Sequence, residues 1–317
     1  MTLILKILKW SFLAFIIGII FFFIINFKAD IPVEKLKVKY CNSQSKFIEI
    51  DGMQVHYRDE GNSLDSVPIV LIHGTSSSLH TWDECTKGWI KNHRVIRFDL
   101  PAFGLTGPNK DDDYSIARYV LFVNELLKKL SVNHCYIAGN SLGGYITWEF
   151  TLNHPEKVKK MILIDAGGYP LDPNKSGTLA FRMGKNPVLK HLLTFLTPRS
   201  VVEKSVKTAY YDESKVTEVV VDRYMDFTLR EGNRKALVSR LNQPFVDNSA
   251  KIKNITTPTL IIWGDHDRLI PIDCAYKFQK DLPNNKLVIL KNDGHVPMEE
   301  SPEKVIPFVE IFIQTAK

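Results

Sequence analysis

Short apolar runs alternate with stretches of helical spacing along most of this chain, and few folds accommodate such a pattern. The runs are rich in β-branched residues and cover residues 69–72, 95–98, 135–138, 161–164, 260–263 and 287–290. Where strands alternate with helices, each connecting helix packs on a face of the sheet, so the strands run parallel and both faces are covered. The sequence therefore predicts an α/β fold with a mostly parallel central sheet and helices on both faces.

Turn and cap residues place the first strands and several helices. The dipeptide Asp51-Gly52 separates the alternating runs 47–50 and 53–57, and this turn chemistry predicts a β-hairpin. Ser115 is expected to begin a helix, because a serine hydroxyl accepts hydrogen bonds from the free N–H groups of a first turn. Further helices are expected after Ser141, Pro271 and Pro302.

The alternation stops between about residues 170 and 249, where helical apolar spacing, aromatic side chains and positive charge take over. A stretch of this length between two core strands is typical of an inserted cap. The expected domains are a membrane anchor at 1–28, a linker at 29–46, an α/β core at 47–170 and 250–317, and a helical cap at 171–249.

The N-terminal segment is apolar from Trp10 to Ile25, apart from Ser11. With its flanking residues it reaches about the length that crosses a bilayer core as a helix. We therefore expect an uncleaved, single-pass membrane anchor. A cleaved signal peptide is the alternative, because Lys6 and Lys9 form a basic start, although no small-residue cleavage site follows. Lysines flank the run on both sides and leave its orientation open, with a slight preference for an external or periplasmic catalytic domain.

Composition argues against several classes of function. The net charge is +6, but the basic residues are scattered, whereas a nucleic-acid-binding face requires them to cluster. The four cysteines lack metal-ligand spacing, and the sequence contains neither an H-E-x-x-H motif nor a glycine-rich nucleotide fingerprint. We expect no metal, no cofactor and no nucleic-acid partner, and nothing in the sequence indicates a protein partner.

The run Gly139-Asn140-Ser141-Leu142-Gly143-Gly144 follows an expected strand and precedes an expected helix. In that context the G-x-S-x-G pattern indicates a sharp strand-to-helix turn, in which the glycines Gly139 and Gly143 permit close packing while Ser141 projects its hydroxyl. A helix that begins after the serine directs its free N–H groups and positive dipole end toward a developing oxyanion.

A serine hydroxyl needs a histidine base and an acid that orients the histidine. His295 follows the expected strand that ends near Leu290, and both Asp265 and Asp267 follow the strand that ends near Trp263. Because carboxyl ends of parallel strands meet at one edge of a sheet, these groups are expected at the same edge as the serine. The residues alone leave the choice between the two aspartates open.

The order Ser141, Asp267, His295 resembles that of the α/β hydrolases, and so do His73-Gly74, the run from Asp99 to Gly104 and the pattern around the serine. The resemblance extends from about residue 47 to the C-terminus. It implies that Ser141 is the nucleophile, His295 the base and Asp267 the orienting acid, since the family spacing selects Asp267 over Asp265. It also implies backbone oxyanion donors at Thr75 and Leu142, with His73 bracing that loop and Asp99 organising a nearby turn.

Within that superfamily the chain is similar to membrane-anchored monoacylglycerol lipases and small bacterial lipases, which implies hydrolysis of acyl or lipid esters through an acyl-enzyme. Related dehalogenases and epoxide hydrolases carry aspartate at the position of Ser141. Carbon–carbon bond hydrolases of ring-cleavage products remain an alternative, although they commonly carry tryptophan where this chain has Val296. A non-catalytic binding protein on the same fold is a further alternative.

Overall fold

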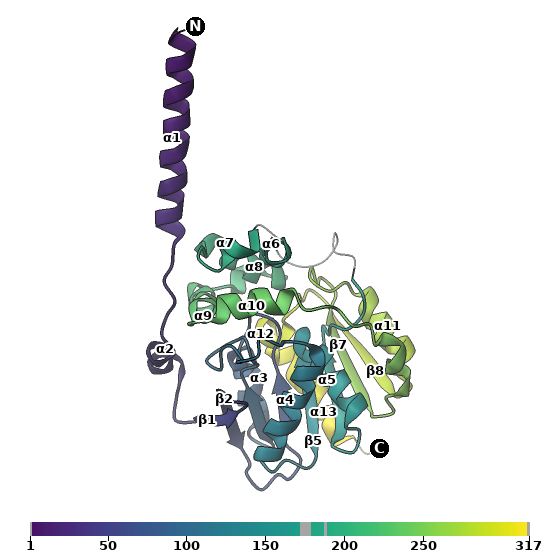
Figure 1. The fold of residues 1–317 in the computed structure, drawn as a ribbon. Helices are drawn as coiled ribbons and strands as arrows, with labels where there is room; N and C mark the ends of the chain where they lie inside the picture. The colour runs from purple at the N-terminus through teal and green to yellow at the C-terminus, as the bar shows by residue number, and fades with distance from the viewer. Residues whose placement is uncertain (1, 172–178, 187–188, 316–317) are drawn as a thin grey trace.

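The computed structural model describes residues 2–171, 179–186 and 189–315 and contains one eight-stranded sheet (Figure 1). The strand order is β1-β2-β4-β3-β5-β6-β7-β8. The strands are β1 (Ser45–Ile50), β2 (Met53–Gly61), β3 (Ile69–Ile72), β4 (Arg94–Phe98), β5 (Cys135–Asn140), β6 (Val158–Ile164), β7 (Thr259–Gly264) and β8 (Asn285–Leu290).

Antiparallel pairing is confined to the pairs β1–β2 and β2–β4. β1 and β2 form the expected hairpin around Asp51 and Gly52, which both adopt positive φ angles, and β2 pairs antiparallel with β4. The pairs from β4 through β3, β5, β6 and β7 to β8 are all parallel. The prediction of a mostly parallel α/β fold is confirmed.

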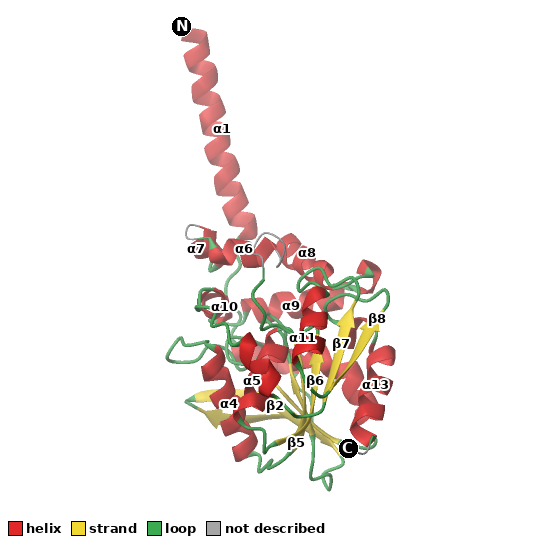
Figure 2. Ribbon diagram, turned by 90° about the vertical axis from the view of Figure 1, so that its right-hand side faces the viewer, coloured by secondary structure: helices red, strands yellow, loops and turns green. Residues whose placement is uncertain are grey.

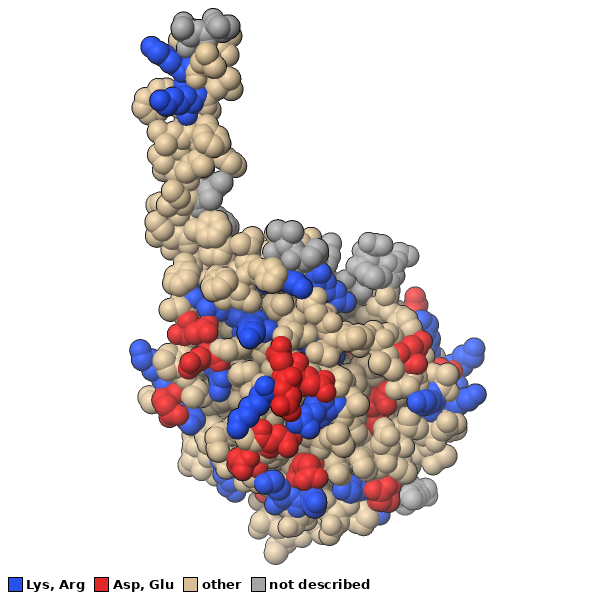
Figure 3. Space-filling view, in the orientation of Figure 1, with Lys and Arg blue, Asp and Glu red and all other residues tan. Residues whose placement is uncertain are grey.

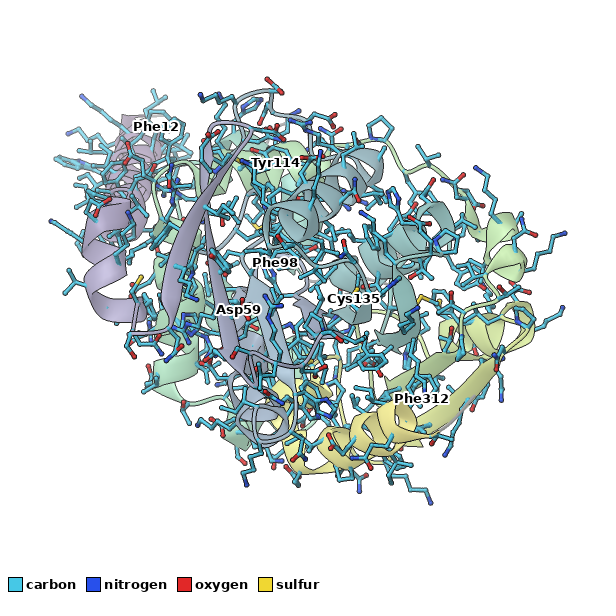
Figure 4. The ribbon with its side chains drawn as sticks, turned by 90° about the horizontal axis from the view of Figure 1, so that it is seen from below. Phe12, Asp59, Phe98, Tyr114, Cys135 and Phe312 are labelled. Carbon is cyan, nitrogen blue, oxygen red and sulfur yellow. The ribbon has the colours of Figure 1, made fainter. Side chains whose placement is uncertain are left out.

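Helices cover both faces of the sheet (Figure 2). One face packs against α4 (Ile116–Lys129), α5 (Leu142–Asn153) and α11 (Asp273–Asp281), and the other packs against α3 (Asp83–Trp89), α12 (Pro297–Glu300) and α13 (Pro302–Gln314). The hydroxyl of Ser115 accepts a hydrogen bond from the N–H of Arg118, so this residue caps α4 as expected. Figure 4 shows Phe98 and Cys135 in the interior, between the two helical layers.

The insertion between β6 and β7 contains five described α-helices, which lie across the carboxyl ends of the parallel strands (Figure 1). They are α6 (Leu179–Lys185), α7 (Leu189–Leu193), α8 (Arg199–Ala209), α9 (Glu218–Leu229) and α10 (Asn233–Leu241). The parts of the expected cap at 172–178 and 187–188 lie outside the described residues. This insertion is called the cap below.

Helix α1 (Thr2–Asn26) projects away from the globular part of the protein (Figures 1 and 2). Its segment Leu3–Asn26 has a mean hydropathy of 2.5, and none of that window is buried. The segment is long and apolar enough to cross a membrane, which a membrane anchor and a signal sequence both require.

Residues 29–46, which we expected to form a linker, contain helix α2 (Val33–Tyr40) and the start of β1. Leu36 of α2 is only 3% exposed and packs with Leu105 and Phe227, a residue of the cap. The segment therefore packs against the body of the protein because one apolar side of α2 is buried there. The helix has only eight residues, which is too short for its apolar spacing to be recognised in the sequence.

Candidate active site

Ser141 occupies a sharp turn between β5 and α5. Its backbone angles are φ 57° and ψ −117°, a strained conformation for a residue with a side chain. A Cβ atom on Gly143 would lie 2.2 Å from the carbonyl oxygen of Ile72, and one on Gly139 would lie 2.2 Å from that of Gly143. The turn thus requires glycine at both positions, because strand and helix backbones approach each other too closely for any other residue.

His295 and Asp267 form a buried pair at the carboxyl edge of the sheet. The Nδ1–H of His295 donates to Oδ2 of Asp267 over 2.7 Å. The other carboxylate oxygen, Oδ1, accepts from the N–H groups of Leu269 at 2.7 Å and Ile270 at 3.0 Å. Three donors therefore fix the orientation of Asp267, and Asp267 in turn fixes the ring of His295.

Asp265 lies in a different environment, although only one residue separates it from Asp267. Its carboxylate accepts from Nδ1 of His266 at 2.6 Å and from the N–H of Asn292 at 2.8 Å. Its side chain is 26% exposed, whereas that of Asp267 is fully buried. Of the two aspartates that the sequence offered, the structure brings Asp267 to His295.

Ser141 and His295 line the same cavity. The backbone around His295 is fixed from two sides, because its N–H donates to the carbonyl oxygen of Ala209 at 2.7 Å and its carbonyl oxygen accepts from Nδ2 of Asn140 at 2.8 Å. Asn140 directly precedes the serine and so links the two residues. The Ser141 hydroxyl itself forms no hydrogen bond with the described residues.

Thr75 and Leu142, the two expected oxyanion donors, also line this cavity. Leu142 is the first residue of α5, where the N–H has no partner within the helix. The loop of Thr75 is held by His73, whose Nε2 accepts from the N–H of Leu100 at 2.9 Å and whose Nδ1–H donates to the carbonyl oxygen of Gly74 at 2.7 Å. Burial lowers the pKa of His73, which is consistent with a neutral ring that braces the loop.

Asp99 also has the environment expected for it. Its carboxylate accepts from the N–H groups of Leu79 at 2.7 Å and Leu105 at 2.8 Å, and from Nδ1 of His56 at 2.8 Å. These bonds join the loops that follow β3 and β4. Asp99 is fully buried and is not among the residues that line the cavity, so its position fits a structural role.

Asp165, which the sequence reasoning did not single out, lies beside the Asp267–His295 pair. It directly follows β6 and is fully buried. One ligand atom from each of Asp165, Asp267 and His295 lies within 4.8 Å of the other two, and these are the only described residues that form such a group. The sequence contained a signal for Asp165, because this residue follows the apolar run 161–164 as Asp267 follows the run 260–263.

These three residues are poorly suited to hold a metal ion. The Nδ1 of His295 already donates to Asp267, and both oxygens of Asp267 accept hydrogen bonds from protein groups. A cation would have to compete with those short bonds in a position with little exposure. The arrangement is instead that of a carboxylate that orients an imidazole, with a second carboxyl group behind it.

The cavity in front of Ser141 has a volume of about 1520 Å³ and lies between the sheet edge and the cap. Much of its cap wall is apolar, with Val201, Val202, Val206, Leu237, Val238 and Phe245 among the lining residues. Basic side chains also line it, including Lys185, Arg240 and Lys251. The cavity can accommodate a long apolar group next to the serine.

Comparison with known proteins gives a consistent picture of the fold. Residues 67–302, more than half of the chain, match the model of the family described as alpha/beta hydrolase fold. A 2-hydroxy-6-oxononadienedioate/2-hydroxy-6-oxononatrienedioate hydrolase of Burkholderia vietnamiensis is 26% identical over 296 residues, which cover 86% of this chain and 96% of the relative.

Two solved structures are similar in fold. The meta-cleavage product hydrolase CumD of Pseudomonas fluorescens superimposes with a TM-score of 0.74 at 24% identity, covering 86% of this chain and 98% of that one. A bacterial membrane phospholipase A superimposes with a TM-score of 0.75 at 22% identity, covering 97% of each chain. At these identities the likeness extends to the fold alone.

Proposed function

The chain belongs to the α/β-hydrolase fold family, and we propose that it is a membrane-anchored serine hydrolase that cleaves carboxylic esters of acyl or lipid substrates. One observation carries the proposal. A serine on a strained strand-to-helix turn shares an apolar cavity with a histidine whose ring is oriented by a buried aspartate. Nucleophilic acyl transfer requires this set of groups.

In this mechanism the neutral ring of His295 accepts the proton of the Ser141 hydroxyl while the serine oxygen attacks the ester carbonyl carbon. The negative charge that develops on the carbonyl oxygen is stabilised by the N–H groups of Thr75 and Leu142 and by the positive end of α5. The imidazolium, held by Asp267, then returns the proton to the leaving alcohol. Water attacks the acyl-enzyme by the same route and releases the acid.

The walls of the cavity support an acyl or lipid substrate. Aliphatic residues from α8 and α10 face the space in front of Ser141. A long acyl chain placed there leaves water, and each buried methylene group contributes about 0.8 kcal/mol. The aliphatic lining of the cap thus favours esters with extended apolar acyl groups over esters with small polar acyl groups.

The connection between α1 and the cap supports anchoring at the membrane surface. Directly after α1, Ile31 exchanges backbone hydrogen bonds with Leu229 and Glu231, at 2.7 and 3.0 Å. Asp30 pairs with Arg234 of the cap at 2.5 Å. Because only residues 27–30 separate the end of α1 from Ile31, the cap side of the protein faces the bilayer when α1 spans it.

The surfaces near this junction have the matching chemistry. Phe195 of the cap is 61% exposed and Phe27, after α1, is 56% exposed, and Phe27 forms a β-bridge with Leu196. Figure 3 shows α1 as an almost uncharged rod with basic side chains near its N-terminal end. Apolar side chains at such a boundary favour insertion into the lipid interface. A substrate could then reach the cavity from the bilayer.

Carbon–carbon bond hydrolysis is a second candidate. The Burkholderia relative bears the name of a hydrolase of this kind, acting on a dicarboxylic acid. Cationic side chains on the cavity wall favour an anionic substrate, and Arg240 forms no ion pair with the described residues. Against this, Val296 lines the cavity at the position where such hydrolases commonly carry tryptophan.

Turnover of a p-nitrophenyl ester series of increasing chain length by the purified full-length protein, with Ser141→Ala as the control, tests the proposal. Serine-dependent hydrolysis that improves with chain length supports the lipid esterase. Turnover of a 2-hydroxy-6-oxo dienoic acid without ester hydrolysis would favour the second candidate. A folded protein that acts on neither substrate and is not labelled at Ser141 by a serine-directed phosphonate would refute both.

A further inference from the structure

Asp165 is a buried carboxyl group for which the proposed mechanism has no role. It follows β6, next to the loop after β7 that carries Asp267, and its φ angle is 44°. The left-handed region is unfavourable for a residue with a side chain, although aspartate tolerates it better than most. The fold nevertheless fixes a fully buried acid at this position, against the acid that orients His295.

The two carboxyl groups differ in the number of hydrogen bonds that they accept. Oδ1 of Asp165 accepts from the N–H of Gly264 at 2.9 Å. Its Oδ2 is buried and has no partner among the described donors. Asp267, in contrast, accepts from two backbone N–H groups and from the ring of His295. The protein therefore stabilises a negative charge on Asp267 far better than on Asp165.

One carboxylate oxygen of Asp165 and one of Asp267 lie within 4.8 Å of each other in a buried place. Ionisation of both groups is strongly disfavoured there, which favours a proton on one of them. Burial, and then the negative charge of Asp267, raise the pKa of Asp165 well above its usual value. The other charged group nearby is Asp293, which is bonded to Ser301 and paired with Lys304. The lysine offsets part of the charge of Asp293 but does not reach Asp165, so it provides no counter-ion for that group.

We propose that Asp165 is a positioning residue whose carboxylic acid O–H donates a hydrogen bond to Asp267. This inference rests on the proposed function, because it assigns Asp267 as the acid that orients His295. The fourth donor completes the set around the Asp267 carboxylate and fixes its rotamer. It also withdraws charge from that carboxylate, which limits how strongly Asp267 stabilises the imidazolium.

The substitutions Asp165→Asn and Asp165→Ala separate this role from a merely structural one. Asparagine has the shape of a protonated aspartate, with an oxygen that accepts from Gly264 and an amide that donates to Asp267. We expect Asp165→Asn to keep kcat and the acid limb of the pH–rate profile unchanged. Asp165→Ala removes the donor, so kcat falls on the order of tenfold with KM unchanged, and the acid limb moves to higher pH.

Two results would overturn the proposal. An acid limb that moves to lower pH in Asp165→Asn would mean that the wild-type residue carries a negative charge beside His295. A loss of kcat in Asp165→Asn as large as in Asp165→Ala would mean that the donated hydrogen bond is not what matters. The asparagine variant keeps both outcomes measurable even if the alanine variant fails to fold.

Infrared difference spectroscopy provides a readout that does not require turnover. At neutral pH the wild-type protein should show the carbonyl band of a neutral, buried carboxylic acid, and Asp165→Asn should lack it. Absence of the band from the wild-type protein would refute the shared proton. If the wild-type protein hydrolyses no ester but shows the band, the proposed function fails while the protonated Asp165 stands.

Discussion

The carboxyl edge of the sheet and the cap enclose the same cavity, but they are built differently. At the sheet edge, Asp267, His295 and Asn140 each make two or more hydrogen bonds, and each has at least one partner from a distant part of the chain. Apolar side chains of the cap, such as Val201 and Leu237, face the cavity across from them. The hydrogen bonds of the sheet edge hold its polar side chains in fixed positions. The apolar side chains of the cap, in contrast, set the shape of the cavity.

The largest difference between the two regions should come from replacing serines that line the same cavity. Ser141→Ala removes the proposed nucleophile, so kcat should fall by roughly 10⁴-fold or more. Ser205 of the cap also lines the cavity, and Ser205→Ala is the matched control with little expected change. Steady-state kinetics on one p-nitrophenyl ester measures both. Equal losses would mean that Ser141 has no special role.

Within the sheet edge, the two neighbouring aspartates should differ almost as strongly. Asp267→Asn favours the wrong tautomer of His295 and should lower kcat by roughly 10⁴-fold. Asp265 bonds only to His266 and backbone groups, so Asp265→Asn should stay within a few-fold of wild type. Thermal melting of both variants checks that they fold. Similar kcat values in the two variants would contradict the assignment of the acid.

A change in the cap should alter selectivity and leave the chemistry intact. Leu237→Trp narrows the cavity, so kcat/KM for long acyl esters should fall about tenfold while that for the acetyl ester stays nearly constant. Val219→Trp is the control, because Val219 is 76% exposed and is not part of the cavity wall. A uniform loss across the ester series would place Leu237 among the groups that support catalysis.

The junction of α1 and the cap should contribute a smaller effect, measured as a change in stability. Arg234 is 7% exposed and bonds to Asp30, to the carbonyl oxygen of Phe195 and to Thr197. Arg234→Met leaves these acceptors without a donor and should lower the free energy of unfolding by about 1–3 kcal/mol. The half-exposed pair Arg268–Glu213 provides the control, since Arg268→Gln should change almost nothing. Thermal unfolding in detergent measures both.

The pH dependence of stability should show the smallest difference, and its sign follows from Asp165. Because the folded protein raises the pKa of this carboxyl group, it binds a proton that the unfolded chain has already released at neutral pH. Stability therefore falls as pH rises from the unfolded value through the raised one. Asp165→Asn should flatten that decline when stability is measured by denaturant unfolding at a series of pH values. Asp281 is the control, because this partly exposed aspartate at the end of α11 accepts a hydrogen bond from the Tyr169 hydroxyl at 2.8 Å, so Asp281→Asn should leave the decline in place. A decline of unchanged steepness would remove Asp165 as its source.

Much of the architecture could be predicted because the signals are local. The strand around residues 161–164, for example, is apparent from its apolar residues, since a parallel strand is buried on both faces. Residues 29–46 show the limit of such signals. Leu36 packs with the cap residue Phe227, and Tyr40 contacts Phe227 with its ring and donates its hydroxyl to Asp226. Helix α2 has only eight residues, which is shorter than the window over which helical spacing is recognised.

The alternation of short apolar runs and helices determined the fold of this protein, and the pattern around Ser141 placed that residue at a strand-to-helix turn, because both depend on neighbours within a few positions. The residues alone left two aspartates open, and the family spacing selected Asp267. Only the tertiary structure places Asp267 against His295 and Asp165 behind it. Residues 165, 267 and 295 belong to different strand ends, and only the parallel pairing of β6, β7 and β8 brings them together. The charge on each carboxyl group follows from that proximity, which no local pattern encodes.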